Sequence, residues 1–167
     1  LFVVFIAGLL AGVVTSAIHI KLRIPDLLSG ILTMTMLYSV NLRIMGNKAN
    51  VSFLRIPTLF SDLIDFAYDR LPFLEQPEMM ILVFLVIFVV ILKILLDLFY
   101  HTDMGLTMGA LGSNPQLVVS QGVNPDTIKI IGICFGNGLA SLAGAFSAMY
   151  VGYADVGMGT GVVVSGL

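Results

Sequence analysis

Charged residues are scarce in this chain, and their scarcity narrows the class of protein to which it can belong. Lys, Arg, Asp and Glu make up 11% of the 167 residues, hydrophobic residues make up 58%, and the mean hydropathy is +1.04. Soluble domains contain about 25% charged residues, so this composition predicts an integral membrane protein. The formal net charge of −2 excludes a nucleic-acid binder that works by neutralising phosphates.

The chain also lacks the residues and motifs of common catalytic and metal sites. Its single cysteine, Cys134, lies in an apolar run, so neither a disulfide framework nor a cysteine-based metal site is available. The patterns G-x-x-x-x-G-K-[ST], H-E-x-x-H and G-x-S-x-G are absent. His19 and His101 are each isolated in sequence from a second metal ligand or a nucleophile. We therefore predict no catalytic site, metal site or cofactor, and transport against a gradient would need a partner or an ion.

Long apolar runs are what the chain has instead. Each has close to the roughly 20 residues that a helix needs to cross a hydrocarbon core of about 30 Å, and none alternates as a barrel strand does. The predicted spans are Phe2–Ile20, Leu27–Ile44, Met79–Tyr100 and Thr127–Val151. The sequence stops at residues 164–167 within what reads as a fifth apolar segment, and no initiator Met precedes Leu1. We expect a single all-α, polytopic transmembrane domain over residues 1–167, forming an internal fragment of a longer polypeptide.

The distribution of charge predicts which loops face the cytoplasm. Lys21 and Arg23 lie in the short turn between the first two spans, which favours the cytoplasmic side. Alternation then places residues 45–78 outside and residues 101–126 inside. Lys48, Arg55 and Arg70 also lie in the outer loop, so a raw count of Lys and Arg favours the opposite orientation. The outer loop contains the segment 58–69, in which three aspartates share one helical face and apolar residues share another. We interpret this segment as an amphipathic helix at the outer membrane surface.

Two helix starts of the same design occur in the inner loop. Asn114-Pro115 and Asn124-Pro125 each place a capping side chain before a proline, whose fixed φ suits the first helical position. Gly122 can adopt positive φ and closes the first of these helices. The pattern predicts a rigid helix of about seven residues between two spans, at 1.5 Å per residue roughly 10 Å long.

Small residues recur at every fourth position of the last predicted span. Such a groove lets another helix backbone approach closely, because lipid tails offer no hydrophobic reward for helix pairing. The predicted packing groove consists of Gly132, Gly136, Ala140, Gly144 and Ala148. The first span repeats the pattern with Gly8, Gly12 and Ser16, so we expect a tight bundle whose helices can rock.

Polar side chains within the spans have two interpretations. They either line a path for a solute or form hydrogen bonds between helices, each contributing about 0.6 kcal/mol. The candidate path residues are Thr33, Ser39, Asn41 and Asn137. Lys93 and Asp97 are four residues apart near the end of the third span and can pair, as a snorkelling lysine with its partner or as part of a proton relay.

Several motifs together resemble a known family of transport proteins. Residues 112–129 read G-S-N-P-Q-L-V-V-S-Q-G-V-N-P-D-T-I-K, residues 136–145 read G-N-G-L-A-S-L-A-G-A, and residues 153–159 read Y-A-D-V-G-M-G. These motifs, with residues 30–46, resemble ABC-transporter permeases of the branched-chain amino acid and ribose permease superfamily. The subgroup comprises amino-acid permeases paired with lipoprotein binding proteins. The chain departs from the family pattern at Gln116, where an acidic residue is usual.

The resemblance implies a set of partners and a role for the inner loop. It implies a permease in a bacterial plasma membrane that dimerises with a second copy, binds two cytoplasmic ABC ATPase subunits and receives solute from an external lipoprotein. The short helix would then be a coupling helix that docks on the ATPase. Its residues are Asn114, Pro115, Gln116, Leu117, Val118, Gln121 and Gly122.

The function we predict is ATP-driven import of a small solute, an amino acid or a related compound. An ion-coupled secondary transporter or channel would need charged or ion-coordinating groups at the midplane, where the spans have neutral amides and hydroxyls. A membrane-embedded enzyme would need a paired nucleophile and base. The identity of the solute is not encoded in any motif that we recognise.

Overall fold

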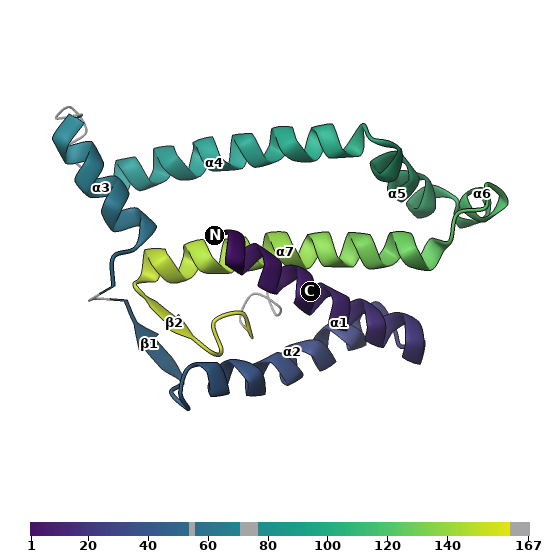
Figure 1. The fold of residues 1–167 in the computed structure, drawn as a ribbon, viewed down its shortest axis with the longest axis horizontal. Helices are drawn as coiled ribbons and strands as arrows, with labels where there is room; N and C mark the ends of the chain where they lie inside the picture. Colours follow the sequence, from purple (N-terminus) through teal and green to yellow (C-terminus); the bar gives the residue numbers. More distant parts are fainter. Residues whose placement is uncertain (54–55, 71–76, 161–167) are drawn as a thin grey trace. The chain divides into compact units, whose positions relative to one another are not determined.

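The structure is a computed structural model that describes residues 1–53, 56–70 and 77–160. The chain divides into two compact units: the first comprises Leu1–Leu54 and Gly122–Leu167, and the second comprises Arg55–Gln121. Helices dominate each unit (Figure 1). Four of them are long and apolar enough to cross a membrane, which confirms the prediction of an all-α membrane helix bundle. The predicted start of a fifth span lies outside the described residues.

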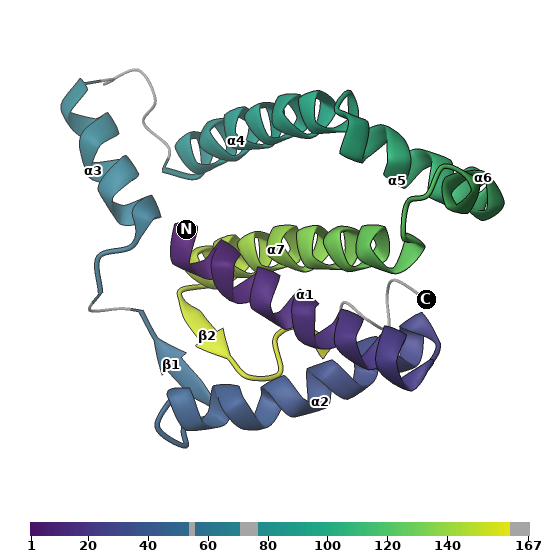
Figure 2. The same ribbon diagram turned by 45° about the vertical axis from the view of Figure 1, so that its right-hand side comes forward.

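Three long helices form the body of the first unit. They are α1 (Phe2–Leu22), α2 (Asp26–Ile44) and α7 (Pro125–Val151). Figures 1 and 2 both show α1 lying across α7, and α2 follows α1 after a short turn. Arg23 ends α1 in the left-handed conformation, with φ 52°, and Pro25 precedes α2 with ψ 147°. This left-handed residue and the extended proline reverse the chain within a few residues.

The contact between α1 and α7 depends on glycine. A Cβ atom added to Gly8 would lie 2.6 Å from the carbonyl oxygen of Asn137, and one added to Gly12 would lie 3.0 Å from that of Ile133. The first distance is shorter than real Cβ contacts show, the second is at their lower limit, and a Cβ on Gly12 would also overlap the Cα of Cys134. The two backbones therefore touch where a side chain would separate them. The close approach predicted for the first span is therefore present.

A small antiparallel ladder joins the chain segments that follow α2 and α7. Strand β1 (Asn50–Ser52) pairs with β2 (Tyr153–Asp155), with Val51 opposite Ala154. Because β1 follows α2 and β2 follows α7, the carboxyl ends of these two helices lie on the same side of the first unit. The sequence does not predict these strands, since three residues are too few for a periodic pattern.

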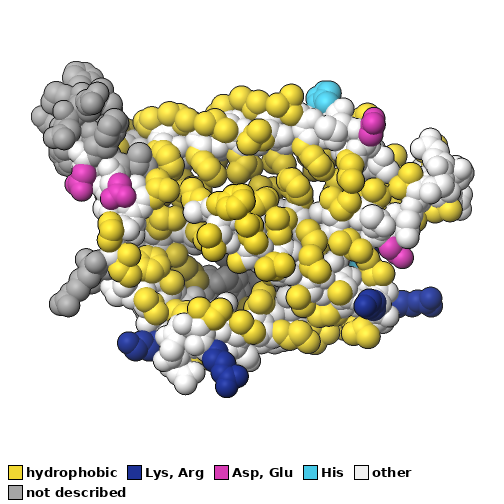
Figure 3. All heavy atoms as spheres, viewed as in Figure 1, with side chains coloured by type: hydrophobic (Ala, Val, Ile, Leu, Met, Phe, Trp, Pro, Cys, Tyr) yellow, Lys and Arg dark blue, Asp and Glu magenta, His cyan; other side chains and the backbone are white. Residues whose placement is uncertain are grey.

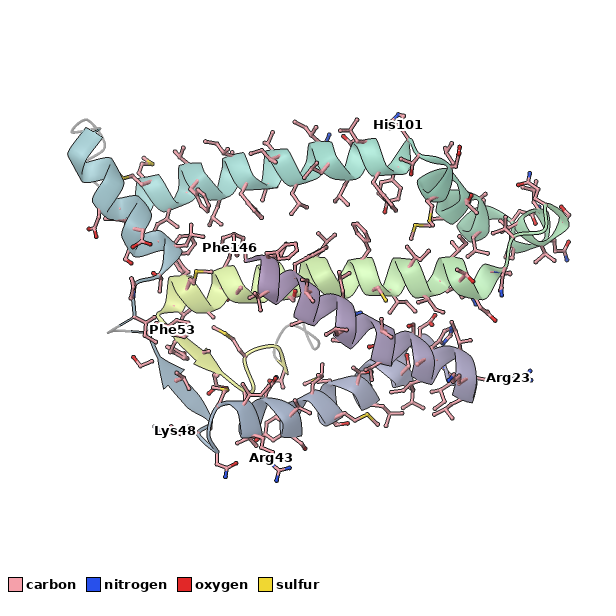
Figure 4. All side chains as sticks on the ribbon, in the orientation of Figure 1. Arg23, Arg43, Lys48, Phe53, His101 and Phe146 are labelled. Carbon is pink, nitrogen blue, oxygen red and sulfur yellow. The ribbon has the colours of Figure 1, made fainter. Side chains whose placement is uncertain are left out.

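Charged side chains of the first unit lie at the ends of its helices. Arg23 is at one end of the unit, and Arg43 and Lys48 are at the other (Figure 4). In the space-filling view, hydrophobic side chains cover most of the visible helix surface, and the visible Lys and Arg side chains lie at helix ends and connections (Figure 3). This distribution is the one expected of helices whose middle sections face lipid or other helices.

The second unit contains the long helix α4 (Pro77–Tyr100). Among the described residues of this unit, one helix precedes α4 in the chain, and two shorter helices follow it. Helix α3 (Leu59–Arg70) coincides with the predicted amphipathic segment. Thr58 and Ser61 cap its start reciprocally: the Ser61 backbone N–H donates to Thr58 Oγ1 at 3.3 Å, and the Thr58 N–H donates to Ser61 Oγ at 2.8 Å. Phe60, only 3% exposed, packs edge-on against Phe84 of α4, with ring centroids 6.3 Å apart.

Helix α5 (Asp103–Ser113) was not predicted from the sequence, which indicated only a polar connection before the first Asn-Pro pair. Thr102 caps it by accepting a hydrogen bond from the Gly105 N–H. Gly105 also lies against the backbone of Phe99 and Tyr100, at the end of α4. Glycine has low intrinsic helix propensity, so three glycines in eleven residues obscured this helix in the sequence.

Candidate functional site

A cavity of about 760 Å³ lies within the first unit, bounded by α1, α2, α7 and the segment that follows β2. Most of its apolar lining comes from α2, through Leu27, Ile31, Met34 and Leu37. Small-molecule sites in proteins have volumes of about 300 to 1,000 Å³ and are lined mainly by apolar groups with a few polar ones. The cavity therefore has the size and the lining of a site for a small solute.

Three of the four predicted path residues line this cavity. Thr33 and Asn41 reach it from α2, and Asn137 reaches it from α7. The fourth, Ser39, is exposed on α2 and is not among the residues that line the cavity. The fold thus brings together polar side chains that are about a hundred residues apart in sequence, and it leaves Ser39 on another face of α2.

The two threonine hydroxyls that α1 and α2 contribute to the cavity donate to helix backbone. Thr15 donates to the carbonyl oxygen of Ala11 at 2.9 Å, and Thr33 donates to that of Ser29 at 2.9 Å. The Nδ2 of Asn137 donates to the carbonyl oxygen of Ile133, also at 2.9 Å, which fixes the orientation of this amide because the acceptor is a carbonyl. The oxygens Thr15 Oγ1, Thr33 Oγ1 and Asn137 Oδ1 consequently keep capacity to accept hydrogen bonds.

Sequence reasoning missed several residues of this cavity, among them the polar residues Thr15 and Asp155. Thr15 is 8% exposed and lies near the predicted small-residue positions of the first span. Asp155 lies at the end of β2, in the Y-A-D-V-G-M-G segment that was noted only as a family-like motif. An acidic residue just after a predicted span is the signal that would have found it.

The short helix predicted in the inner loop is present as α6 (Pro115–Ser120), one residue shorter than expected. The Oδ1 of Asn114 accepts from the backbone N–H of Gln116 at 3.1 Å and of Leu117 at 3.3 Å. Gly122 has φ +80°, the positive value predicted for it. At the start of α7, Asn124 Oδ1 accepts from the Asp126 N–H at 2.9 Å, so both Asn-Pro caps form.

Helix α6 has one buried residue and an apolar exposed surface. Val118 is 1% exposed, whereas Leu117 is 45% and Val119 is 56% exposed. Pro115, Gln116, Val119 and Ser120 line a shallow hollow on this helix. Exposed valine and leucine side chains on a rigid helix are typical of a surface that contacts another protein.

The small residues predicted to form a groove on α7 do not all face the same neighbour. A Cβ atom on Gly136 or on Gly144 would meet nothing within 4 Å, and Ala140 is exposed, whereas Ala148 is 9% exposed and Gly132 is half-buried. Helix α1 packs on an adjacent face of α7, where Gly138 and Ser141 lie. The groove at Gly136, Ala140 and Gly144 is therefore open in the part of the chain that the structure describes.

Two ion pairs occur among the described residues, one on α4 and one that includes the lining residue Asp26. Lys93 Nζ and Asp97 Oδ2 are 2.9 Å apart on the surface of α4. His19 Nδ1 lies 2.9 Å from Asp26 Oδ1 and 2.7 Å from the carbonyl oxygen of Ile24, so Nδ1 bears the hydrogen. Within the described residues, no group of three His, Cys, Asp or Glu side chains is placed to hold a metal ion.

Comparison with known proteins adds a family to these features. The whole chain, residues 1–167, matches the family of branched-chain amino acid transport system permease components. A tyrosine transport system permease protein of Clostridioides difficile is 43% identical over 162 residues, which make up 97% of this chain and 50% of that protein. An uncharacterized protein of Rickettsia prowazekii is 36% identical over 162 residues, which make up 97% of this chain and 53% of that protein.

The chain spans about half the length of the curated relatives that it matches. No solved structure matches it.

Proposed function

The chain belongs to the branched-chain amino acid transport system permease family, and from this we propose that it forms part of the membrane-spanning subunit of a binding-protein-dependent ABC importer. It is a multi-pass membrane protein, with four helices long and apolar enough to cross a bilayer. The importer lies in a bacterial plasma membrane. Its energy comes from ATP hydrolysis on separate cytoplasmic subunits, and a second permease copy completes the membrane-spanning part.

The feature that best supports this function is the doubly capped helix α6. A transport motor can move membrane helices only through an element that does not deform, and Asn114 and Gly122 fix the two ends of α6. The exposed Leu117 and Val119 would contact an apolar cleft on the ATPase. On this proposal α6 lies at the cytoplasmic face, as the positive residues Lys21 and Arg23 between the first two spans also favour.

The solute path is proposed to run through the cavity of the first unit. Thr33, Asn41 and Asn137 provide polar groups in a cavity whose other walls are largely apolar. The ladder of β1 and β2 places the carboxyl ends of α2 and α7 on one side, which we assign to the outside where a lipoprotein would deliver the solute. Because a relative is named for tyrosine transport, we propose an amino acid as the solute.

Reconstitution tests this function directly. The full-length permease would be co-expressed with the ATPase and the lipoprotein encoded beside it, purified, and inserted into liposomes. We expect the ATPase to copurify with the permease. We also expect L-tyrosine uptake to require ATP inside the vesicles, on the side of the membrane where α6 lies. Failure of the ATPase to copurify, with uptake that instead collapses when an ionophore removes an ion gradient, would favour a secondary transporter.

A further inference from the structure

The cavity of the first unit contains an acidic residue to which neither the motifs nor the relatives give a role. Asp155 is half-buried, lines the cavity, and is followed by Val156, Gly159 and Thr160, which line it too. Burying a carboxylate beside apolar helices is costly unless a cation or several donors compensate its charge. The charged groups and hydrogen-bond donors around the Asp155 carboxylate therefore indicate which kind of solute the cavity can bind.

The backbone around Asp155 is held firmly in place. Asp155 pairs with Asn50 in the β1–β2 ladder, and the next residue, Val156, donates its N–H to the carbonyl oxygen of Ala49 at 3.0 Å. The Oδ1 of Asp155 accepts from the Gly157 N–H at 2.7 Å, which fixes the side chain. The carboxylate is thus positioned by the fold before any solute arrives, which lowers the entropic cost of binding one.

No protein cation neutralises this carboxylate in the part of the chain that the structure describes. The ion pairs there join His19 with Asp26 and Lys93 with Asp97, and no hydrogen-bond donor among those residues reaches Asp155 Oδ2. The lining residues include neither Lys nor Arg. The other lining carboxylate, Asp26, has its own partner in His19, and its side chain is 82% exposed.

The neutral polar groups of the cavity add to the same electrostatic character. The hydroxyls of Thr15, Thr33 and Thr160 donate to the carbonyl oxygens of Ala11, Ser29 and Gly157, so their oxygens can only accept further hydrogen bonds. Tyr38, Asn41 and Asn137 also line the cavity, and their hydroxyl and amide groups can donate as well as accept. The cavity therefore offers one carboxylate oxygen that no donor of the described residues reaches, together with neutral acceptors and a few neutral donors. The carboxylate suits a solute group with a positive charge and N–H donors, and it disfavours a solute that carries negative charge alone.

We propose that Asp155 is the solute-recognising residue of this cavity and binds the ammonium group of the transported molecule. Asp155 Oδ2 would accept a charge-assisted hydrogen bond from the ammonium. The cavity then selects for amines and zwitterions and against simple anions. This inference rests on the proposed function, because it assigns the specificity of the same path.

Charge-selective labelling tests the inference without requiring transport. In the full-length protein in membranes, Cys134→Ala is combined with replacement of every other cysteine that the full-length protein contains, and Asn41→Cys then places a single thiol on the cavity lining. Its reaction rates with cationic 2-aminoethyl and anionic 2-sulfonatoethyl methanethiosulfonate give a cation-to-anion ratio. We expect Asp155→Asn, which keeps the acceptor for Gly157, to lower this ratio at least about fivefold, as removal of one nearby charge requires.

A matched control removes a carboxylate outside the cavity. Asp126 lies at the start of α7 in the same unit and is not among the lining residues. Asp126→Asn should therefore change the ratio by less than about twofold, because solvent ions screen the effect of a charge outside the cavity. Thr33→Cys provides a second labelling position if Asn41→Cys disturbs the protein. An equal ratio with and without Asp155, or no labelling at either position, would overturn the inference.

Uptake measurements separate this inference from the proposed function. In the reconstituted importer, Asp155→Asn should reduce L-tyrosine uptake about tenfold or more, the loss expected from one charge-assisted hydrogen bond. The rate of ATP hydrolysis stimulated by the binding protein should be the same in this variant as in wild type. If labelling depends on Asp155 but ATP drives no uptake, the importer proposal fails and the cation site stands. If ATP drives uptake equally in wild type and Asp155→Asn, the importer stands and the cation site is wrong.

Discussion

Ser141 of α7 and Val4 of α1 lie 137 positions apart in sequence, and the Ser141 Oγ is 2.9 Å from the Val4 carbonyl oxygen. The same Oγ is 2.7 Å from the Gly138 carbonyl oxygen, so its one hydrogen is shared between two acceptors. A polar contact between membrane helices contributes only about 0.6 kcal/mol on average. The energy of the α1–α7 contact must therefore come mainly from close packing, which Gly8 and Gly12 permit.

The first prediction follows from this packing. Gly12 lies directly against Cys134, with the Ile133 carbonyl oxygen 3.0 Å from the position of an added Cβ. Gly12→Ala should therefore destabilise the protein by about 1–3 kcal/mol, the usual cost of overpacking a close contact. Thermal denaturation in detergent, followed by circular dichroism, measures the effect.

The matched control for this prediction is Gly136→Ala. Nothing lies within 4 Å of an added Cβ there, so this variant should be as stable as wild type or slightly more stable, because alanine favours the helix. Equal melting temperatures for Gly12→Ala and wild type would contradict the close approach of the two backbones.

A second prediction concerns Lys93 and Asp97. The two side chains are 73% and 55% exposed and lie one helical turn apart, a geometry that contributes only about 0.3–0.5 kcal/mol. If the pair only positions a snorkelling lysine, Lys93→Gln should leave ATP-dependent uptake within about twofold of wild type, since so small an energy cannot change the rate further. Loss of uptake in both Lys93→Gln and Asp97→Asn, with normal expression, would indicate a proton relay instead.

Strong local signals made much of the fold predictable from sequence. Hydrophobic runs identified all four long helices, with α1 ending two residues later than expected and α7 beginning two residues earlier. The Asn-Pro pairs identified the starts of α6 and α7, because capping chemistry involves only neighbouring residues. The missed elements depend on distant contacts: the β1–β2 ladder needs two segments about a hundred residues apart.

The candidate site was predictable only in part, for the same reason. Thr33, Asn41 and Asn137 were found because polar groups stand out in apolar spans, but periodicity alone could not say that Ser39 faces elsewhere. The sequence does not show that Asp155 lines the cavity, because its position there depends on the pairing of β1 with β2. The open face at Gly136 and Gly144 shows that a small-residue pattern predicts close packing without naming the partner.

A third prediction uses the two neighbouring valines of α6. Val119 is 56% exposed, so Val119→Asp should leave the helix intact while placing a charge on the proposed ATPase contact. We expect the ATPase to dissociate during purification of this variant. Normal copurification and uptake would show that this surface is not the contact.

Val118→Asp serves as the contrasting variant. Val118 is 1% exposed, and burial of an unpaired carboxylate at this position should destabilise the unit itself, by several kcal/mol. Its melting temperature should therefore fall, whereas that of Val119→Asp should not. Equal melting temperatures would show that the two positions are similarly accessible.

The last prediction concerns the rigidity of α6 rather than its surface. Asn114→Ala removes the acceptor for the Gln116 and Leu117 N–H groups, at a cost of about 1 kcal/mol. Gly122→Ala forces an alanine into the left-handed conformation at φ +80°, at a further cost of about 1–2 kcal/mol. A helix of six residues has little stability of its own, so the double variant should fray it while the long helices stay folded.

A frayed α6 would absorb the movement of the ATPase instead of transmitting it. In the reconstituted importer we therefore expect the double variant to keep ATP hydrolysis but to lose most of its uptake. Gly112→Ala is the control, because Gly112 lies in α5, has no positive φ, and has open space around an added Cβ. That control should transport normally. Full uptake by the Asn114→Ala and Gly122→Ala double variant would mean that the capped helix is not the lever between ATPase and membrane helices.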